Sequence, residues 1–505
     1  MDAFIIANMA PLMFASLVVV LLLGYPVAFA LAFNGLVWGL VGIHFGLFAP
    51  TFFQALPDRL FGVMSNETLL AIPFFTFMGL ILERSGMAEE LLDTIGQLFG
   101  PVRGGLALAV VLVGALLAAT TGVVAASVIA MGLISLPIMM RYGYDRRLAT
   151  GVIAASGTLA QIIPPSLVLI VMADQLGKSV GDMYSGAVVP GLVLSGLYVG
   201  YVIAITIIYP KAAPALPKEF RTIHGAQLAI RVAVALIPPL VLIFLVLGTI
   251  FIGLATPTEG GAMGAVGALV LAALKGRLNW TIVRQALDST TKLSSFVLFI
   301  LIGSRVFSLT FFGVNGHVWV ENLLTGLPGG QIGFLIVVNI LVFVLAFFLD
   351  FFELAFIVVP LVGPAADHLG IDLIWFGILL GINMQTAFMH PPFGFSLFYL
   401  RSVAAREPYN DRITGERIAP ITTGQIYWGA APFVVIQVLM IGLTIAFPGM
   451  VMRYKSDELH IDTTNMKIEA PVNFGTGSSG GAGGPNFGAD NNGAGSGPNF
   501  GPPAQ

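Results

Sequence analysis

The sequence predicts an all-α polytopic membrane protein made of two inverted repeats, each with a re-entrant hairpin and a helix broken at a double proline. The composition is the first reason: of 505 residues, 57% are hydrophobic and 10% are charged, whereas a soluble domain carries roughly 25% charged residues. The second reason is that the stretch Asp145–Pro165 recurs as Asp372–Pro392 at an offset of 227 residues. A duplicated, proline-interrupted apolar helix is typical of the binding site of a secondary transporter.

The first repeat is predicted to span residues 1–210. Two membrane helices, about 9–23 and 27–43, are joined tightly at Gly24-Tyr25-Pro26. The further elements expected in this half are an interfacial segment 44–65, a helix 69–82, an amphipathic surface helix 88–98, a re-entrant hairpin 104–140, a broken helix 148–173 and a helix 186–209.

Two re-entrant hairpins are predicted from the length of two apolar segments and from the polar or glycine residues that interrupt them. Residues 104–140 are too many for one crossing and too few for two, since a crossing takes about 20 residues, and Thr120-Thr121-Gly122 divides them. The segment 331–364 corresponds to them at the same offset and is divided at Asp350. Irregular backbone at membrane depth is tolerated only inside protein or beside a polar cavity. Both hairpin tips are therefore expected to face a site.

The second repeat is predicted to span residues 232–450, after a cytoplasmic linker 211–231 rich in proline and lysine. Its expected elements are helices 232–253 and 260–274, a basic segment 275–292, a helix 293–312, the hairpin 331–364, a broken helix 375–400 and a last helix 427–447. Residues 451–505 form a tail rich in Gly, Asn and Pro that we expect to be disordered, because it has too little apolar surface to bury.

The distribution of basic residues predicts on which side of the membrane each loop lies. Basic residues cluster in 141–147, 211–231, 275–292 and 401–417, which the positive-inside rule assigns to the cytoplasm. Residues 314–330 and 365–372 contain no Lys or Arg and should be periplasmic. The two equivalent loops therefore lie on opposite sides, which requires inverted repeats with an odd number of crossings each. Both chain termini are then expected in the periplasm.

Several other classes of protein are disfavoured. A net charge of −3 gives no support for a nucleic-acid partner, and the absence of cysteine excludes disulfides and thiolate metal sites. Leu176-Gly177-Lys178-Ser179 resembles the end of a phosphate-binding loop, but Met172 replaces its first glycine. We therefore expect no nucleotide partner, no covalent cofactor and, without a nucleophile–base arrangement, no enzyme. The N-terminal stretch lacks a basic region before its apolar run, which favours a membrane helix over a signal peptide.

Asp350 is the most informative single residue. A carboxylate inside the apolar run FFLDFFE is costly and marks an ion or substrate path by default. Glu353 follows three residues later, which a helix would place on nearly the same face. The alternative is a structural ion pair between Asp350 and Arg305. Arg305 could instead meet a substrate carboxylate.

Other polar groups are expected to converge with Asp350 from both repeats. Broken helices coordinate Na⁺ through freed carbonyls and receive anions at half-helix N-termini. The alternative for each hydroxyl is a bond within its own helix. The Na⁺-site candidates are Thr120, Thr121, Gly122, Ser156, Pro164, Asp350, Thr386 and Pro391, and the substrate-site candidates are Ser166, Arg305, Asn383, Gln385, Glu353 and His390.

Motifs over roughly residues 1–450 carry a family resemblance: LLAIPFF (69–75), IIPPS (162–166), ATPTEGGAMG (255–264), FFLDFF (347–352) and HPPFGFSLF (390–398). With them the chain resembles the large membrane subunit of the TRAP (tripartite ATP-independent periplasmic) transporters. The resemblance implies an elevator-type fold of the ion-transporter superfamily and sodium-coupled uptake of an organic acid anion, such as an α-keto or other monocarboxylic acid. It also implies a bacterial inner-membrane location, a small four-helix membrane subunit and a periplasmic binding protein as partners.

The chain departs from the family pattern at three places. Thr121-Gly122-Val123-Val124 stands where many relatives have a serine-rich tip, His390 stands in place of a threonine, and Glu353 in place of a small residue. These departures put the ligands of the first cation site in question. The rival interpretations are a proton-coupled carrier or exporter of organic anions that works without a binding protein, and a channel.

Overall fold

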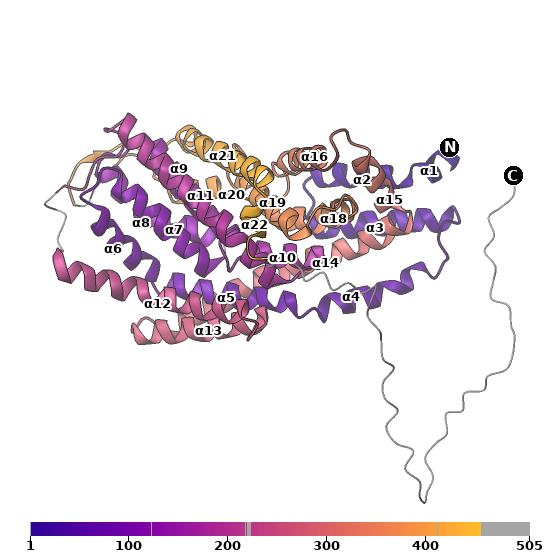
Figure 1. Cartoon of the computed structure of the whole chain (residues 1–505), viewed down its shortest axis with the longest axis horizontal. Coiled ribbons are helices and arrows are strands. Elements are labelled where there is room, and N and C mark those ends of the chain that lie inside the picture. Colours follow the sequence, from indigo (N-terminus) through magenta and orange to yellow (C-terminus); the bar gives the residue numbers. More distant parts are fainter. Residues whose placement is uncertain (1, 123, 218, 220–223, 412, 456–505) are drawn as a thin grey trace, which may run out of the picture. The chain divides into compact units, whose positions relative to one another are not determined.

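The computed structural model describes residues 2–122, 124–217, 219, 224–411 and 413–455. Their regular secondary structure is almost entirely helical (Figure 1). Seven of the described helices are long and apolar enough to cross a membrane, or up to ten crossings if each bent helix pair counts as one. The predicted class, an all-α polytopic membrane protein, is confirmed.

The first half of the chain follows the expected order. Its helices are α1 (Asp2–Ala7), α2 (Met9–Leu22), α3 (Val27–His44), η1 (Phe52–Ala55), α4 (Leu56–Met64), η2 (Thr68–Leu70), α5 (Ala71–Arg84), α6 (Met87–Phe99), α7 (Gly105–Thr121), α8 (Val124–Arg141), α9 (Arg146–Thr158), η3 (Leu159–Gln161), α10 (Leu167–Leu176) and α11 (Val180–Ile208).

The second half contains longer helices than expected. They are α12 (Gly225–Phe251), α13 (Pro257–Leu274), α14 (Trp280–Gly313), α15 (Gly316–Thr325), α16 (Gly330–Leu345), α17 (Phe351–Ile357), α18 (Val359–His368), α19 (Leu373–Thr386), α20 (Phe395–Val403), α21 (Thr423–Ala446) and α22 (Gly449–Met452). The short strands β1 (Tyr409–Asn410) and β2 (Arg417–Ile418) pair antiparallel in the loop before α21.

Three predicted boundaries were wrong. The linker 211–231 ends early because α12 begins at Gly225. The basic segment 275–292 is mostly the start of α14, whose first turn is capped by the side chain of Asn279. Disorder was predicted from residue 451, yet Val451 is only 1% exposed and belongs to α22. The rest of that prediction concerns residues 456–505, which lie outside the described residues.

Local sequence explains where the broken helices begin and end. The Asp145 carboxylate accepts hydrogen bonds from the amides of Arg147 and Leu148 at 2.9 and 3.0 Å, which caps α9. Asp372 caps α19 in the same way. An N-cap aspartate satisfies amides that have no partner within the helix. Pro164 and Pro391 follow each helix, and proline cannot continue one because it lacks an N–H.

The first hairpin bends at glycine. Gly122 ends α7 with φ +58°, a left-handed conformation that glycine adopts without steric cost. The arms α7 and α8 then pack against each other. In the second hairpin, α16 ends at Leu345 and α17 starts after Asp350, so five residues between them are not helical.

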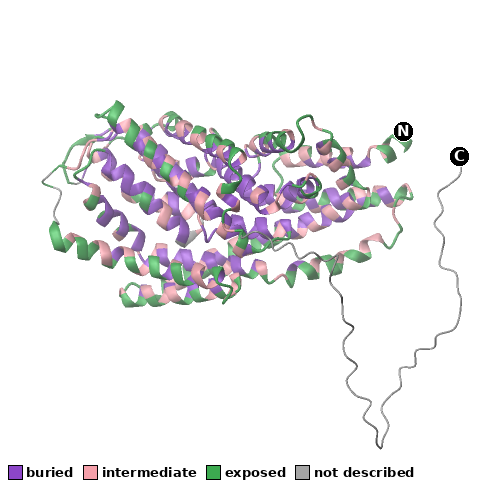
Figure 2. Ribbon diagram, in the orientation of Figure 1, coloured by how far each residue is buried: buried purple, intermediate pink, exposed green. Residues whose placement is uncertain are grey.

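The helices pack in two sets. In one set α3 packs on α14 and α5 on α13. In the other, α9 packs against α7, α8 and α21, while α19 contacts α10, α11 and α21. A methyl group on Gly151 of α9 would lie 2.1 Å from the carbonyl oxygen of Gly429 in α21, so those two backbones touch. Figure 2 shows that the faces between the helices of each set are buried, whereas the outer faces of α12 and α13 are exposed.

One ion pair fixes the loop before α21. The guanidinium of Arg141, at the end of α8, donates to both carboxylate oxygens of Asp411 at 2.9 to 3.0 Å. The Arg141 guanidinium, helped by donors of Thr414 and Ile413, holds the pKa of the Asp411 carboxyl well below its ordinary value. The loop is thereby attached to the first hairpin.

Candidate functional site

Both hairpin tips and both broken helices meet at one cavity of about 390 Å³, here called the central cavity. Four of its walls come from the two hairpins and the two broken helices, which correspond to each other in pairs at the offset of 227 residues. The fifth wall comes from α14. The lining residues are Gly122, Val124 and Ala125 of the first hairpin, Gln161, Leu167 and Val168 of the first broken helix, Asp350, Phe351, Phe352 and Glu353 of the second hairpin, Phe388, Phe395 and Tyr399 of the second broken helix, and Leu293 and Phe296 of α14.

Asp350 and Glu353 form a capping box at the start of α17. The Asp350 carboxylate accepts from the Glu353 amide at 2.9 Å, and the Glu353 carboxylate accepts from the Asp350 amide at 2.9 Å. This arrangement satisfies two amides that α17 itself leaves free. The box fixes both carboxylates beside the cavity. Among the described residues, neither carboxylate forms an ion pair with a lysine or arginine.

Arg305 lies in a different cavity, so the hypothesis of an Asp350–Arg305 ion pair was wrong. Its side chain lines a cavity of about 610 Å³ together with Arg59, Asp174 and Asp367. That cavity lies between α14 on one side and α10 and α18 on the other. Asp350 must therefore be accounted for without Arg305.

The remaining polar residues of the second broken helix make buried bonds within the protein. Gln385 donates to the Thr158 hydroxyl at 3.0 Å, a bond between residues 227 apart. Asn383 donates to the carbonyl and side-chain oxygens of Asn339 at 2.7 and 3.0 Å, and Thr386 donates to the Asn383 carbonyl at 2.6 Å. These three residues do not line the central cavity. The bonds of Gln385 and Asn383 attach α19 to α9 and α16, whereas the bond of Thr386 lies within α19 itself.

His390 lies behind the central cavity rather than in it. Its ring is stacked on Phe347 at 4.3 Å and meets Phe343 edge-on at 4.3 Å. Only 1% of the residue is exposed, and neither ring nitrogen has a hydrogen-bond partner in the part of the chain that the structure describes. His390 therefore packs the second double proline against α16.

The candidates of the first broken helix are buried and do not line the central cavity. Ser166 is buried and donates to the Gln161 carbonyl oxygen, while Ser156 is buried with a hydroxyl that lacks a partner among the described residues. Pro164 is buried and Pro391 half-buried. Thr120 and Thr121 form the end of α7, and their side chains lie outside the described structure. Of the first tip, Gly122 lines the cavity.

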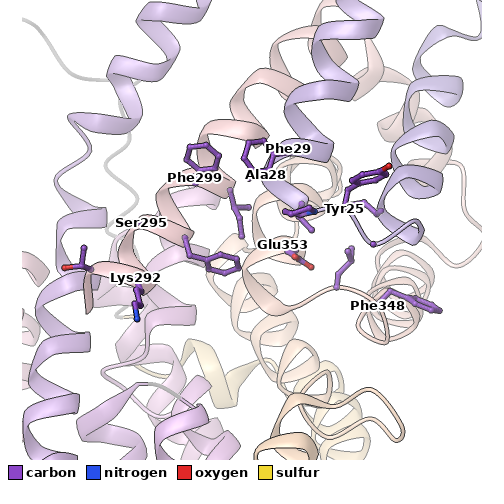
Figure 3. A pocket seen from close by; sticks show the side chains of 16 residues that line it. Tyr25, Ala28, Phe29, Lys292, Ser295, Phe299, Phe348 and Glu353 are labelled. Atoms are coloured by element: carbon purple, nitrogen blue, oxygen red, sulfur yellow. The ribbon is translucent and has the colours of Figure 1, made fainter. Parts of the chain in front are cut away.

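A second cavity of about 720 Å³ adjoins the first and shares Phe296 and Glu353 with it. It lies between the α2–α3 turn, α14 and the second hairpin tip. Figure 3 shows Glu353 near its centre, with Ser295 and Phe299 on one side and Tyr25 and Phe348 on the other. Glu353 is therefore accessible from two cavities.

Sequence reasoning missed the apolar side of the site. Phe351 and Phe352 directly follow Asp350 in the motif that drew attention to it, and they could have been inferred from that position. Phe296 and Phe388 come from segments far away in the chain, so only the fold brings them to the cavity. Gln161 precedes the first double proline. Its position in the fold, and not its place in the sequence motif, shows that it lines the cavity.

Comparisons with known proteins give one consistent result. Residues 14–450 match the family model of the tripartite ATP-independent periplasmic transporter, DctM component. The C4-dicarboxylate TRAP transporter large permease protein DctM of Pseudomonas aeruginosa is 34% identical over 358 residues, which cover 71% of this chain and 82% of that relative. Its counterpart in Vibrio cholerae is 32% identical, with coverage of 79% and 90%.

More distant relatives differ in their named substrate. The ectoine TRAP transporter large permease protein TeaC of Halomonas elongata is 26% identical, covering 87% of this chain and 97% of the relative. Among solved structures, the Alcanivorax borkumensis YdaH transporter superposes with a TM-score of 0.52 at 16% identity, over 79% of this chain and 89% of that one. At that identity the likeness supports the fold alone.

Proposed function

Because the chain belongs to the DctM component family of tripartite ATP-independent periplasmic transporters, we propose that it takes up an organic acid anion by sodium-coupled secondary transport. One observation carries this proposal: two hairpin tips and two broken helices surround a single cavity that also holds two carboxylates. Discontinuous helices around a site near the middle of the membrane are the common architecture of secondary transporters.

The electrostatics of the cavity call for a cation, and we propose that this cation is sodium. Asp350 and Glu353 lie at its wall without an ion pair to any described lysine or arginine. A carboxylate away from water is costly unless a cation neutralises it. The carbonyl and hydroxyl groups of the two tips are ligands of the kind that discontinuous helices offer to Na⁺. We place one sodium ion at Asp350. We propose Gly122 and Thr121, at the tip of the first hairpin, as the sodium ligands that correspond to Asp350 in the other repeat.

The packing supports an elevator movement of one set of helices against the other. We assign the hairpins and broken helices, α7–α10 and α16–α20, to the moving domain, and add α11 and α21 because they pack tightly on α9 and α19. Polar contacts between described residues of this domain and the scaffold include the approach of His368 on α18 to Glu321 on α15 at 3.8 Å. Asn66 donates to Asp174 at 2.5 Å, and Ser304 donates to the Phe356 carbonyl at 2.6 Å. A rigid-body shift would have to exchange these bonds for new ones, because a buried group left without a partner costs about 1–3 kcal/mol.

The proposed context is the bacterial inner membrane. TRAP large permeases work with a small membrane subunit and a periplasmic binding protein, and we propose the same partners for this chain. The inverted-repeat orientation, with both termini in the periplasm, completes the proposal. It places the equivalent loops at Asp145 and Asp372 on opposite sides of the membrane.

Uptake by reconstituted protein tests the proposal. Proteoliposomes that contain the chain, its small subunit and the cognate binding protein are given a panel of labelled organic acids with and without an inward sodium gradient. Uptake should require both the gradient and the binding protein. Transport that persists when choline replaces sodium would identify a proton-coupled carrier or exporter instead, and ion conductance without the binding protein would identify a channel.

A further inference from the structure

We propose that Arg305 binds the carboxylate of the transported acid when the moving domain has slid along α14, away from the position described here. This inference rests on the proposed function, because it takes the central cavity as the substrate site and assumes the elevator movement. Its basis is that one scaffold helix borders two cavities. Through Leu293 and Phe296, α14 lines the central cavity, and through Arg305 it lines the cavity of about 610 Å³, here called the arginine cavity.

Helix α17 lies along α14 and gives the direction of the slide. The rings of Phe352 and Phe296 meet at 6.3 Å, and one helical turn later the carbonyl of Phe356 accepts from the Ser304 hydroxyl at 2.6 Å. The two helices therefore run in the same direction. The start of α17, which carries the two carboxylates of the central cavity, lies at the Phe296 end of this contact. Arg305 lies next to Ser304 at the other end.

The length of the slide follows from helix geometry. Arg305 follows Phe296 by nine residues, which is roughly 13 Å along α14 at a rise of 1.5 Å per residue. A shift of the moving domain by that length toward Gly313 would bring the central cavity from Phe296 to Arg305. The other end of α14 lies in the basic segment 275–292, which the proposed orientation assigns to the cytoplasm. The slide is therefore directed toward the periplasm.

In the position described here, the charge of Arg305 lies opposite carboxylates of the moving domain. Asp174 of α10 and Asp367 of α18 line the arginine cavity, and Arg305 forms no ion pair with them or with any other described carboxylate. The slide would carry both aspartates away. Arg59 of α4 is exposed to solvent, whereas Arg305 is half-buried. Arg305 therefore needs a new counter-charge in the shifted state, because a charge away from water is costly without a partner.

The acid, in turn, needs a cation that the central cavity lacks. The lining residues include two carboxylates and neither lysine nor arginine. The sodium ion that we place at Asp350 offsets the charge of that carboxylate, so the acid itself still has no cationic partner. Arg305 supplies one in the shifted state, since a guanidinium can hold a carboxylate by two parallel hydrogen bonds. Because Arg305 stays on the scaffold, the return slide separates the acid from it and favours release to the cytoplasm.

Cysteine pairs test the slide without any acid. The chain has no cysteine of its own. Phe296→Cys with Phe352→Cys should form a disulfide under mild oxidation in membranes, because these side chains are in contact here. Ser308→Cys with Phe352→Cys should form one as well, although about 18 Å of α14 separates Ser308 from Phe296, because Ser308 lines the arginine cavity within one turn of Arg305. A disulfide in the first pair without one in the second would overturn the inference.

Binding to the locked protein tests the contact with the acid. Dissociation constants for acetate, pyruvate and succinate are measured in saturating NaCl on the purified chain held by either disulfide. In the form locked between positions 308 and 352, Arg305→Gln should weaken binding roughly tenfold to a hundredfold, the loss expected for a hydrogen bond to a charged group. Arg305→Lys should restore part of it. In the form locked between positions 296 and 352, Arg305→Gln should change nothing.

The matched control is Arg284→Gln. Arg284 is exposed on the same helix and lines neither cavity, so acid binding to both locked forms should be unchanged. Equal effects of Arg284→Gln and Arg305→Gln would contradict the assignment, and so would a failure of all three acids to bind the form locked between positions 308 and 352.

Glu353→Gln separates the acid from the other partner that the slide offers to Arg305, the Glu353 carboxylate. The variant keeps a capping box, because glutamine also serves in one. If Arg305 binds the acid, Arg305→Gln should weaken acid binding as strongly in the Glu353→Gln background as without it. Equal affinities in that background would overturn the inference. Sodium-dependent uptake of an acid by the wild-type chain would then still support the proposed function, so the two failures are distinguishable.

Discussion

Asp350→Asn separates the electrostatic role of Asp350 from its structural one. Asparagine and aspartate are about equally good N-caps, so the variant should retain the bond to the Glu353 amide and the start of α17. What it loses is the charge. Asp350→Ala, by contrast, removes the cap as well and should lower stability by about 0.5–2 kcal/mol.

The expected loss of sodium affinity in Asp350→Asn follows from the absence of a basic partner for Asp350 among the described residues. Because no described lysine or arginine pairs with Asp350, the sodium ion is its partner in our account. Truncation of one member of a close charge pair costs about 2–5 kcal/mol. That corresponds to a fall in sodium affinity of roughly 30-fold to several thousandfold. Uptake at ordinary sodium should collapse, and high sodium should partly restore it.

The assay is a sodium titration of uptake and of melting temperature on the same preparations. Glu259→Gln is the matched control, because Glu259 forms an equivalent capping box with Thr256 on α13, away from the cavity. It should leave the sodium dependence unchanged. An unaltered sodium midpoint in well-folded Asp350→Asn protein would refute the reasoning and remove Asp350 from the site.

Three further predictions follow from individual contacts. Thr158→Val leaves the amide of Gln385 without its buried acceptor. The free energy of unfolding in detergent should therefore fall by about 1–3 kcal/mol. The control is Thr249→Val on α12, which should have little effect because Thr249 donates only within its own helix. Because Arg141 lowers the pKa of Asp411, this pair should stabilise the protein above the unfolded carboxyl pKa of about 3.9 and lose that contribution as the pH falls below it; the melting temperature of Arg141→Gln should be lower at pH 7 and flatter with pH. Arg147→Cys and His368→Cys should label from opposite sides of the membrane, and labelling from one side would exclude inverted repeats.

The sequence predicted those parts of the fold that depend on local chemistry and on duplication. Asp145 and Asp372 cap the broken helices, and the breaks at Gly122 and the double prolines lie where glycine and proline require them. These signals are local, so a single sequence contains them. The extent of α14 could not be predicted in the same way, because its basic first turns look like a loop by composition.

The candidate site was predictable only in its charged part. Asp350 stood out because a carboxylate in an apolar run is costly, and it does line the cavity. Arg305 looked like a partner by the same argument, yet the fold directs it to another cavity. Composition cannot distinguish these outcomes, since both residues lie in apolar stretches of the sequence. The phenylalanines of the cavity wall, such as Phe296 and Phe388, come from segments far apart in the sequence, so only the fold brings them together.

The most direct test of the central claim is the coupling between sodium and the acid in one preparation of the purified chain. If both ligands bind in the cavity between the two hairpin tips, sodium should raise the affinity for the transported acid, and the acid should raise the affinity for sodium by the same factor. We expect a factor of about 5–150, the usual range for coupled sites, and its loss in Asp350→Asn. Acid binding that is equal with and without sodium would contradict the account.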